Sequence, residues 1–161
     1  MEQFSQLSAA FEQQLVPSTA KPGQRQAESG DGRLEISVVF TSAEAASAAL
    51  RKAALLAGNL SARITLIVPQ VVPFPLPLSS PPVLLDFREE RLREIATSCV
   101  LETLVRIYLC RDRWDILKAV LTPNSLIVLG RRSGWWRFNN EQRLARRLRK
   151  AGHEVVVAEA E

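Results

Sequence analysis

The chain is short of the residues that carry most protein chemistry. It has one histidine, His153, and two cysteines, Cys99 and Cys110, among 161 residues. The cysteines are eleven positions apart, which matches neither a metal-binding nor a redox-active spacing. No serine or cysteine lies near the histidine in the sequence, and no pair of carboxylates stands out. We therefore expect no catalytic residues, no metal site and no enzymatic activity.

Signals for export and for membrane insertion are also missing. The start, MEQFSQLSAAFEQQL, has neither a basic n-region nor an apolar h-region, so export is not expected. Two cysteines without a leader favour a reducing cytoplasm. Residues 64–85 carry no charge, but they contain six prolines. Because proline denies a helix its backbone hydrogen bonds, this stretch predicts a loop and no transmembrane segment.

Positive charge is concentrated near the C-terminus. The net charge is only +4, and 47% hydrophobic with 24% charged residues is typical of a soluble globular protein. Residues 131–150, however, hold eight Arg and Lys against one Glu. Arg143, Arg146 and Arg147 belong to a predicted helix there, which indicates either a solvated face or a surface for nucleic acid or anionic lipid. Without a recognised binding motif, nucleic acid is the less favoured partner.

The first 32 residues are expected to form a flexible N-terminal tail. Phe4, Leu7, Phe11 and Leu15 are at helical spacing, which predicts a short amphipathic helix over residues 2–15. Residues 17–32 have the composition of a linker. The domain is therefore expected to span residues 33–161.

Strand and helix patterns alternate five times in the domain. Apolar runs that predict strands occupy residues 34–41, 62–68, 105–110, 125–130 and 153–159. Helices are predicted after a capping box from Thr41 to Glu44, over 87–104, after Asp112, and near 140–151. Nearly continuous apolar strands that alternate with helices predict an α/β fold. We expect one five-stranded parallel sheet with helices on both faces.

Two C-terminal blocks, NSLIVLGRRSG and RRLRKAGHEVVVAE, are the most specific part of a family resemblance. With the order of elements, they make residues 33–159 similar to the universal stress protein family. The resemblance implies a Rossmann-like sheet of strand order 3-2-1-4-5. It also implies a homodimer paired through the C-terminal strand, and some members of the family bind ATP.

The resemblance implies a ligand crevice where the ends of strands one and four meet. There, two glycines would let the backbone approach an anion, nearby arginines would neutralise phosphate, and helix amides would donate hydrogen bonds. Trp135 or Trp136 could stack on a base. The candidate cofactor-binding residues are Thr41, Ser42, Gly130, Arg131, Arg132, Ser133, Gly134 and Asn140. The other interpretation makes Thr41 and Ser42 helix caps, and the segment Gly130–Gly134 a plain strand-to-helix connection.

The family's nucleotide motif is altered in this chain. Ser133 stands at the second glycine position, Glu141 and Gln142 stand where a Gly-Ser/Thr pair is expected, and Thr41 replaces an Asp. We therefore predict a non-catalytic, homodimeric regulatory or stress-response binding module with a degenerate nucleotide site and an unknown protein partner. One alternative is an ATP/ADP-binding protein that uses an atypical Gly130–Gly134 loop. The other is a basic surface that binds nucleic acid or anionic lipid.

Overall fold

The computed structural model describes residues 10–15, 33–58, 60, 62–77, 85–133 and 138–160. Six parallel strands form one sheet in the order β1-β4-β3-β2-β5-β6. The strands are β1 (Ala10–Leu15), β2 (Leu34–Val39), β3 (Ala62–Val71), β4 (Thr103–Cys110), β5 (Leu126–Arg131) and β6 (Glu154–Glu159). The helices are α1 (Ala43–Ala57), α2 (Leu85–Thr97), α3 (Arg113–Val120) and α4 (Phe138–Lys150). The predicted five-stranded order 3-2-1-4-5 is confirmed as β4-β3-β2-β5-β6.

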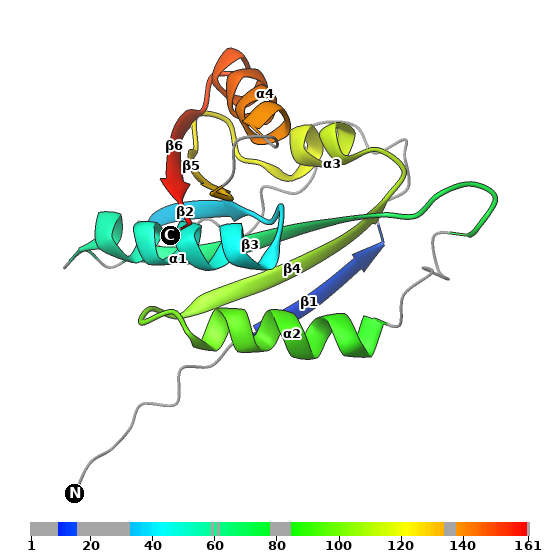
Figure 1. Cartoon of the computed structure of the whole chain (residues 1–161), viewed down its shortest axis with the longest axis horizontal. Coiled ribbons are helices and arrows are strands. Elements are labelled where there is room, and N and C mark those ends of the chain that lie inside the picture. Colours follow the sequence, from blue (N-terminus) through cyan, green and yellow to red (C-terminus); the bar gives the residue numbers. More distant parts are fainter. Residues whose placement is uncertain are drawn as a thin grey trace, which may run out of the picture.

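The sheet lies between two pairs of helices (Figure 1). On one face, α1 and α2 pack on a core that includes Ile36, Leu66 and Val105. On the other face, α3 and α4 pack on a core that includes Val39 and Ile127. Because both faces of the central strands are covered, these strands need apolar residues at consecutive positions. The nearly continuous apolar runs in the sequence follow from this burial.

Strand β1 corrects the expectation of a helix over residues 2–15. Residues 10–15 pair in parallel with β4, from Ala10 opposite Leu104 to Leu15 opposite Leu109. The apolar spacing of the segment is helical, but the open edge of β4 offers a row of backbone partners that a local pattern does not reveal. Tertiary context thus overrides local preference in this segment. Residues 2–9 lie outside the described part of the chain.

Two other predicted boundaries shift for physical reasons. The proline-rich stretch was expected to be a loop, yet β3 continues through Pro69 to Val71. Proline is tolerated there because pairing with β2 ends at Ile67, so one side of β3 needs no further donors. Helix α2 ends at Thr97, short of the predicted end at residue 104, and Val100 beyond it is 79% exposed. None of the helices in the described ranges has the length and apolar character needed to cross a membrane.

Candidate functional site

The winding direction of the sheet reverses between β2 and β5. These strands are parallel neighbours, with Val39 opposite Leu129, so Thr41 and Gly130 lie at the same carboxyl rim. From β2 the chain moves through β3 to β4, and it then returns across the sheet to β5 on the other side. Ligand sites of open α/β sheets lie at such a reversal. The sheet therefore brings Thr41 and Gly130 to one rim, as expected.

At this rim Ser42, and not Thr41, caps α1. The Ser42 backbone is extended, and its Oγ accepts a hydrogen bond from the Ala45 amide at 3.2 Å. The predicted capping box is therefore displaced by one residue, because the helix begins at Ala43. Thr41 Oγ1 is buried and makes no hydrogen bond to the described residues. Thr41 is thus left at the rim without a capping role.

Gly130 has a packing role that the sequence did not indicate. A Cβ built on it would lie 1.7 Å from the Ala45 carbonyl oxygen and 2.7 Å from the Ala45 Cα. The first turn of α1 therefore rests directly on the backbone of β5, which only a glycine permits. This contact fills the space over Gly130 on the α1 face, where an anion was expected to approach.

The two arginines that follow Gly130 contact carboxylates. Arg131 forms an ion pair with Glu159 of β6, and Arg132 Nε lies 2.8 Å from Glu44 Oε2 of α1. Such exposed pairs are weak, at about 0–1 kcal/mol, but each cancels the charge of its arginine. The positive charge expected to attract phosphate is therefore largely neutralised. Ser133 is exposed, and residues 134–137, including Gly134, Trp135 and Trp136, lie outside the described part of the chain.

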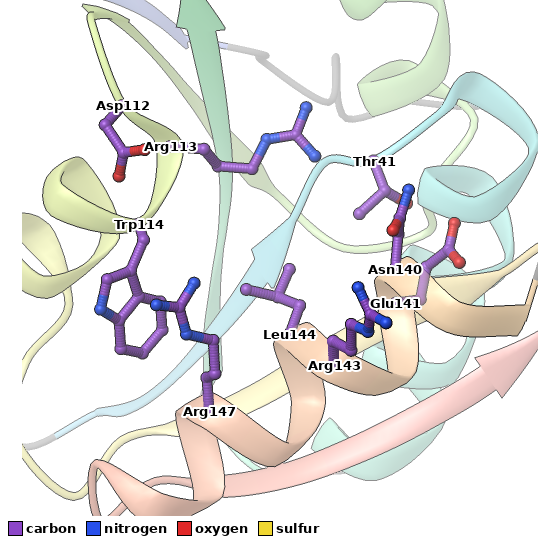
Figure 2. A pocket seen from close by; sticks show the side chains of 9 residues that line it. All are labelled: Thr41, Asp112, Arg113, Trp114, Asn140, Glu141, Arg143, Leu144 and Arg147. Carbon is purple, nitrogen blue, oxygen red and sulfur yellow. The ribbon is translucent and has the colours of Figure 1, made fainter.

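A cavity of about 370 Å³ lies on the other face of the sheet, between α3 and α4 (Figure 2). Its floor includes Thr41 at the end of β2, so it belongs to the same carboxyl rim. The lining residues are Thr41, Asp112, Arg113, Trp114, Asn140, Glu141, Arg143, Leu144 and Arg147. Thr41 and Asn140, both predicted site residues, thus meet in this cavity. We call it the α3–α4 pocket.

Arginine side chains dominate the walls of the α3–α4 pocket. Figure 2 shows Arg113 extending from α3 toward Thr41, while Arg143 and Arg147 rise from α4. Arg147 lies over the Trp114 ring at 4.6 Å, a distance at which the cation and the aromatic face attract. Arg113 and Arg143 form no ion pair with any residue in the described ranges. The pocket therefore offers two guanidinium groups whose charge no carboxylate cancels by direct contact.

The carboxylates of the pocket have separate roles. Asp112 caps α3, because its Oδ1 accepts a hydrogen bond from the Asp115 amide at 2.9 Å. Glu141 lies in the first turn of α4, where the helix dipole favours negative charge. With three arginines against these two carboxylates, the lining has a net charge of +1. The pocket suits a small ligand that carries negative charge.

Helix α4 divides its arginines between two sides. Arg143 and Arg147, one turn apart, line the α3–α4 pocket, whereas Arg146 and Arg149 line a second cavity of about 330 Å³ beside β6. Arg149 also donates to the Val155 carbonyl at 3.0 Å. The inward face of the helix buries Ala145 and Leu148. The basic run in the sequence therefore forms two separate basic flanks.

Two titratable groups with perturbed pKa values, the buried Cys110 and the partly buried His153, lie outside the pocket lining. Burial, with a contribution from nearby Asp112, raises the pKa of the Cys110 thiol to about 11, so this thiol is protonated at neutral pH. Burial lowers the pKa of His153, whose Nδ1 is 3.1 Å from Ser125 Oγ. His153 precedes β6 at the amino edge of the sheet, opposite the pocket. The described residues contain no cluster of three metal-ligating His, Cys, Asp or Glu side chains.

Arg113 and Trp114 were not predicted as ligand contacts, and Arg143 was predicted only as part of a possible surface for nucleic acid or anionic lipid. The signal for the first two was present, because Asp112 follows a strand and caps a helix, which places the next residues at the carboxyl rim. The sequence does not show that α3 and α4 line one cavity. Comparisons with protein-family models, with curated proteins and with solved structures find no match to this chain.

Proposed function

We propose that this chain is a non-catalytic binding module of the universal stress protein type, and that the α3–α4 pocket holds a small anionic ligand. The observation that carries the proposal is the pair of guanidinium groups, Arg113 and Arg143, that face one cavity at the reversal of the sheet. Its volume of about 370 Å³ is near the lower end of the ~300–1,000 Å³ range of ligand pockets. A compact phosphate or carboxylate compound fits this size and charge.

A regulatory role is consistent with the chemistry of the lining. Arginine, asparagine and tryptophan side chains bind and orient a ligand, and no His, Cys or Ser is among the described residues that line the pocket. We propose that a protein partner distinguishes the ligand-bound form from the ligand-free form, as in a stress-response module. The cytoplasm is the proposed location, because Cys99 and Cys110 are both free and buried, which fits a reducing compartment.

Thermal unfolding with a set of anions tests the ligand. Inorganic phosphate, citrate, AMP and Mg²⁺-ATP are each added at millimolar concentration to the full chain. A ligand at 100 times its Kd stabilises the native state by about 2.7 kcal/mol. We expect phosphate, citrate or AMP to raise the melting temperature of the wild type, and the Arg113→Gln/Arg143→Gln variant to lose the shift. Both side chains are exposed, so this variant should fold normally.

Arg132→Gln is the matched control. It also removes one exposed arginine at the same rim, but on the side of α1, so the ligand shift should persist. No shift with any of the four anions, for a correctly folded protein, would contradict the proposal.

ATP or ADP binding through the Gly130–Gly134 loop is the second candidate function. Its support is the position of Gly130 and Arg131 at the reversal of the sheet, where Arg131 and Glu141 of α4 line the same cavity. Against it stand the α1 backbone over Gly130 and the carboxylates on Arg131 and Arg132. In the same assay, a shift specific to Mg²⁺-ATP that Arg132→Gln abolishes would favour this candidate.

Nucleic acid or anionic lipid is less well supported as a ligand. A continuous basic stripe would be needed, whereas the arginines of α4 are divided between two flanks. DNA affinity that falls steeply with salt, and that Arg143→Gln/Arg146→Gln/Arg147→Gln abolishes, would favour it instead.

We also propose a homodimer through β6. This strand pairs only with β5 in the described sheet, so its outer edge offers backbone groups to a second chain. Sedimentation should show a dimer at tens of micromolar. A proline at Val157 should weaken the dimer, because the amides of Glu154 and Ala160 bond to β5 and the alternate Val157 amide therefore faces the outer edge. A monomer at that concentration would contradict this part of the proposal.

A further inference from the structure

The other edge of the sheet is occupied by the chain's own N-terminal segment. Strand β1 pairs with β4 along all six of its residues, and the order of the sheet gives it no other strand neighbour. The β4 edge beneath it is strongly strand-forming, with Val105, Ile107 and Tyr108 almost fully buried. Strand β1 is therefore an addition to a stable edge.

The sequence of β1 is poorly suited to a strand. Four of the six residues in AFEQQL are Ala, Glu or Gln, which favour helices and are uncommon in strands. The apolar spacing of the N-terminal segment is also helical. A conflict between local preference and final structure weakens the folded state of that segment. Backbone pairing with β4 thus stabilises β1 as a strand more than the strand propensity of its own residues does.

The tether between β1 and β2 sets how strongly this strand competes for the edge. The two strands are three positions apart in the sheet, so the tether must cover roughly 25 Å from the end of one to the start of the other. The tether comprises residues 16–33, which is enough residues to span this distance. Because β1 belongs to the same chain as β4, its effective concentration at the edge is on the order of millimolar.

The tether therefore decides between two possible occupants. A second copy of this chain would offer the same weak strand, and exchange would require protein near the millimolar effective concentration. A foreign segment with stronger strand preference can win at much lower concentration. We propose that the outer edge of β4 is a strand-addition site for an extended segment of another protein, and that β1 is a displaceable occupant of this site.

The register of β1 on β4 specifies the chemistry of that partner. Glu12 is the Cα partner of Arg106, so an acidic residue at this register position places opposite charges on neighbouring strands. Gln13 and Gln14 stand opposite Ile107 and Tyr108. A partner with β-branched residues at these two positions would pair better than β1 does. The site thus fits an extended segment with one acidic residue followed by apolar, β-branched residues.

A labelled synthetic peptide tests this inference with the full chain. The probe is residues 8–16 carrying Gln13→Val and Gln14→Val, and its binding is followed by fluorescence anisotropy. In the protein, Gln13→Pro/Gln14→Pro removes a ladder donor, because one of two consecutive strand amides faces β4. We expect this variant to bind the probe at least tenfold more tightly than the wild type. A control proline in the tether, Ala20→Pro, should leave the wild-type affinity unchanged.

A covalent lock gives the opposite result. Glu12→Cys/Arg106→Cys joins register partners at a separation that a disulfide can span, and the oxidised protein should not bind the probe. We call the Gln13→Pro/Gln14→Pro protein the opened variant and the oxidised double-cysteine protein the locked variant. A probe that also carries Glu12→Lys should bind the opened variant several-fold more weakly than the original probe does. Circular dichroism and melting curves show whether each variant folds.

Two outcomes would overturn the inference. One is equal binding of the probe by wild-type, opened and locked proteins, which would place binding elsewhere. The other is a wild-type dimer at tens of micromolar that the double-proline change abolishes, which would make a second copy the occupant of the edge.

Discussion

Gly130→Ala is the most direct test of how the carboxyl rim is built. The added Cβ would lie 1.7 Å from the Ala45 oxygen, 2.3 Å from the Ala45 carbonyl carbon and 2.7 Å from the Ala45 Cα. These are backbone atoms in the first turn of α1, so no side-chain rotation relieves the overlap. The helix and the strand must separate by roughly 1.3 Å before the contact with the oxygen becomes tolerable.

The cost of that separation is large because α1 is tightly packed. Seven of its residues are buried, and Ser42 fixes its start by capping. Overpacking a core costs about 1–3 kcal/mol when side chains can adjust, and a backbone contact belongs at or above the upper end. Alanine recovers only about 0.4–1 kcal/mol by restricting the unfolded chain. We expect a net loss of about 3 kcal/mol, which lowers the melting temperature by about 6–12 °C.

Urea unfolding and calorimetry of the wild type, Gly130→Ala and Gly58→Ala provide the measurement. Gly58 has φ +52° with no atom nearer than 3.9 Å to an added Cβ, so its substitution reports backbone strain without a clash. That strain should cost about 1–2 kcal/mol. If Gly130→Ala is destabilised by less than Gly58→Ala, then α1 does not rest on β5 as described. Any folded fraction of Gly130→Ala should still bind the pocket ligand, because the pocket lies on the other face.

Three further predictions concern stability. Ser42→Ala should lose about 1 kcal/mol in urea unfolding through the lost cap, whereas Thr41→Ala, whose hydroxyl has no partner in the described chain, should lose much less. Because the pKa of Cys110 is raised, its thiol ionises near pH 9.0 in the unfolded chain but near 11 in the folded chain. The free energy of unfolding should therefore fall by up to about 2.7 kcal/mol as pH rises across that window. Cys110→Ala should remove this pH dependence, and an unchanged slope would contradict the burial of the thiol. Because the pKa of His153 is lowered in the folded state, the unfolded chain binds more protons below about pH 6.5, and stability should fall as pH decreases from there. His153→Gln should reduce the pH dependence of the unfolding free energy, measured with urea from pH 5 to 8.

The sequence predicts the sheet well because its strands are buried on both faces. Burial of this kind leaves continuous apolar runs such as residues 66–68 and 126–129, and the helices between the strands carry their own caps, as at Asp112. The parallel strand order follows from the family resemblance and is confirmed. Strand β1 was not predictable from local pattern, because its pairing depends on an edge that exists only after β4 has joined the sheet.

The predicted site residues Thr41 and Gly130 lie at the expected rim, but the pocket that we propose is lined mainly by other elements. Residues with a local signature, such as glycines after a strand and consecutive arginines, were interpreted as an anion loop. In the folded chain, Gly130 serves α1 packing, and the neighbouring arginines contact Glu44 and Glu159. The arginines left for a ligand come from α3 and α4, which are 30 residues apart at Arg113 and Arg143. No spacing rule connects them, since only the packing of α3 on β3 and β4 and of α4 on β5 and β6 brings them together.

The position of α1 explains why the free charge lies on the α3–α4 face. Once the first turn of α1 rests on Gly130, the α1 face of the rim is closed by backbone, and Glu44 in that turn contacts Arg132. On the opposite face the described residues form no such cover, because the start of α3 and one side of α4 line a cavity there together with Thr41. A substitution that closes this cavity, such as Leu144→Trp, should therefore abolish ligand binding while Gly130 and α1 remain undisturbed. If the ligand still binds that variant with wild-type affinity, the site is not the α3–α4 pocket.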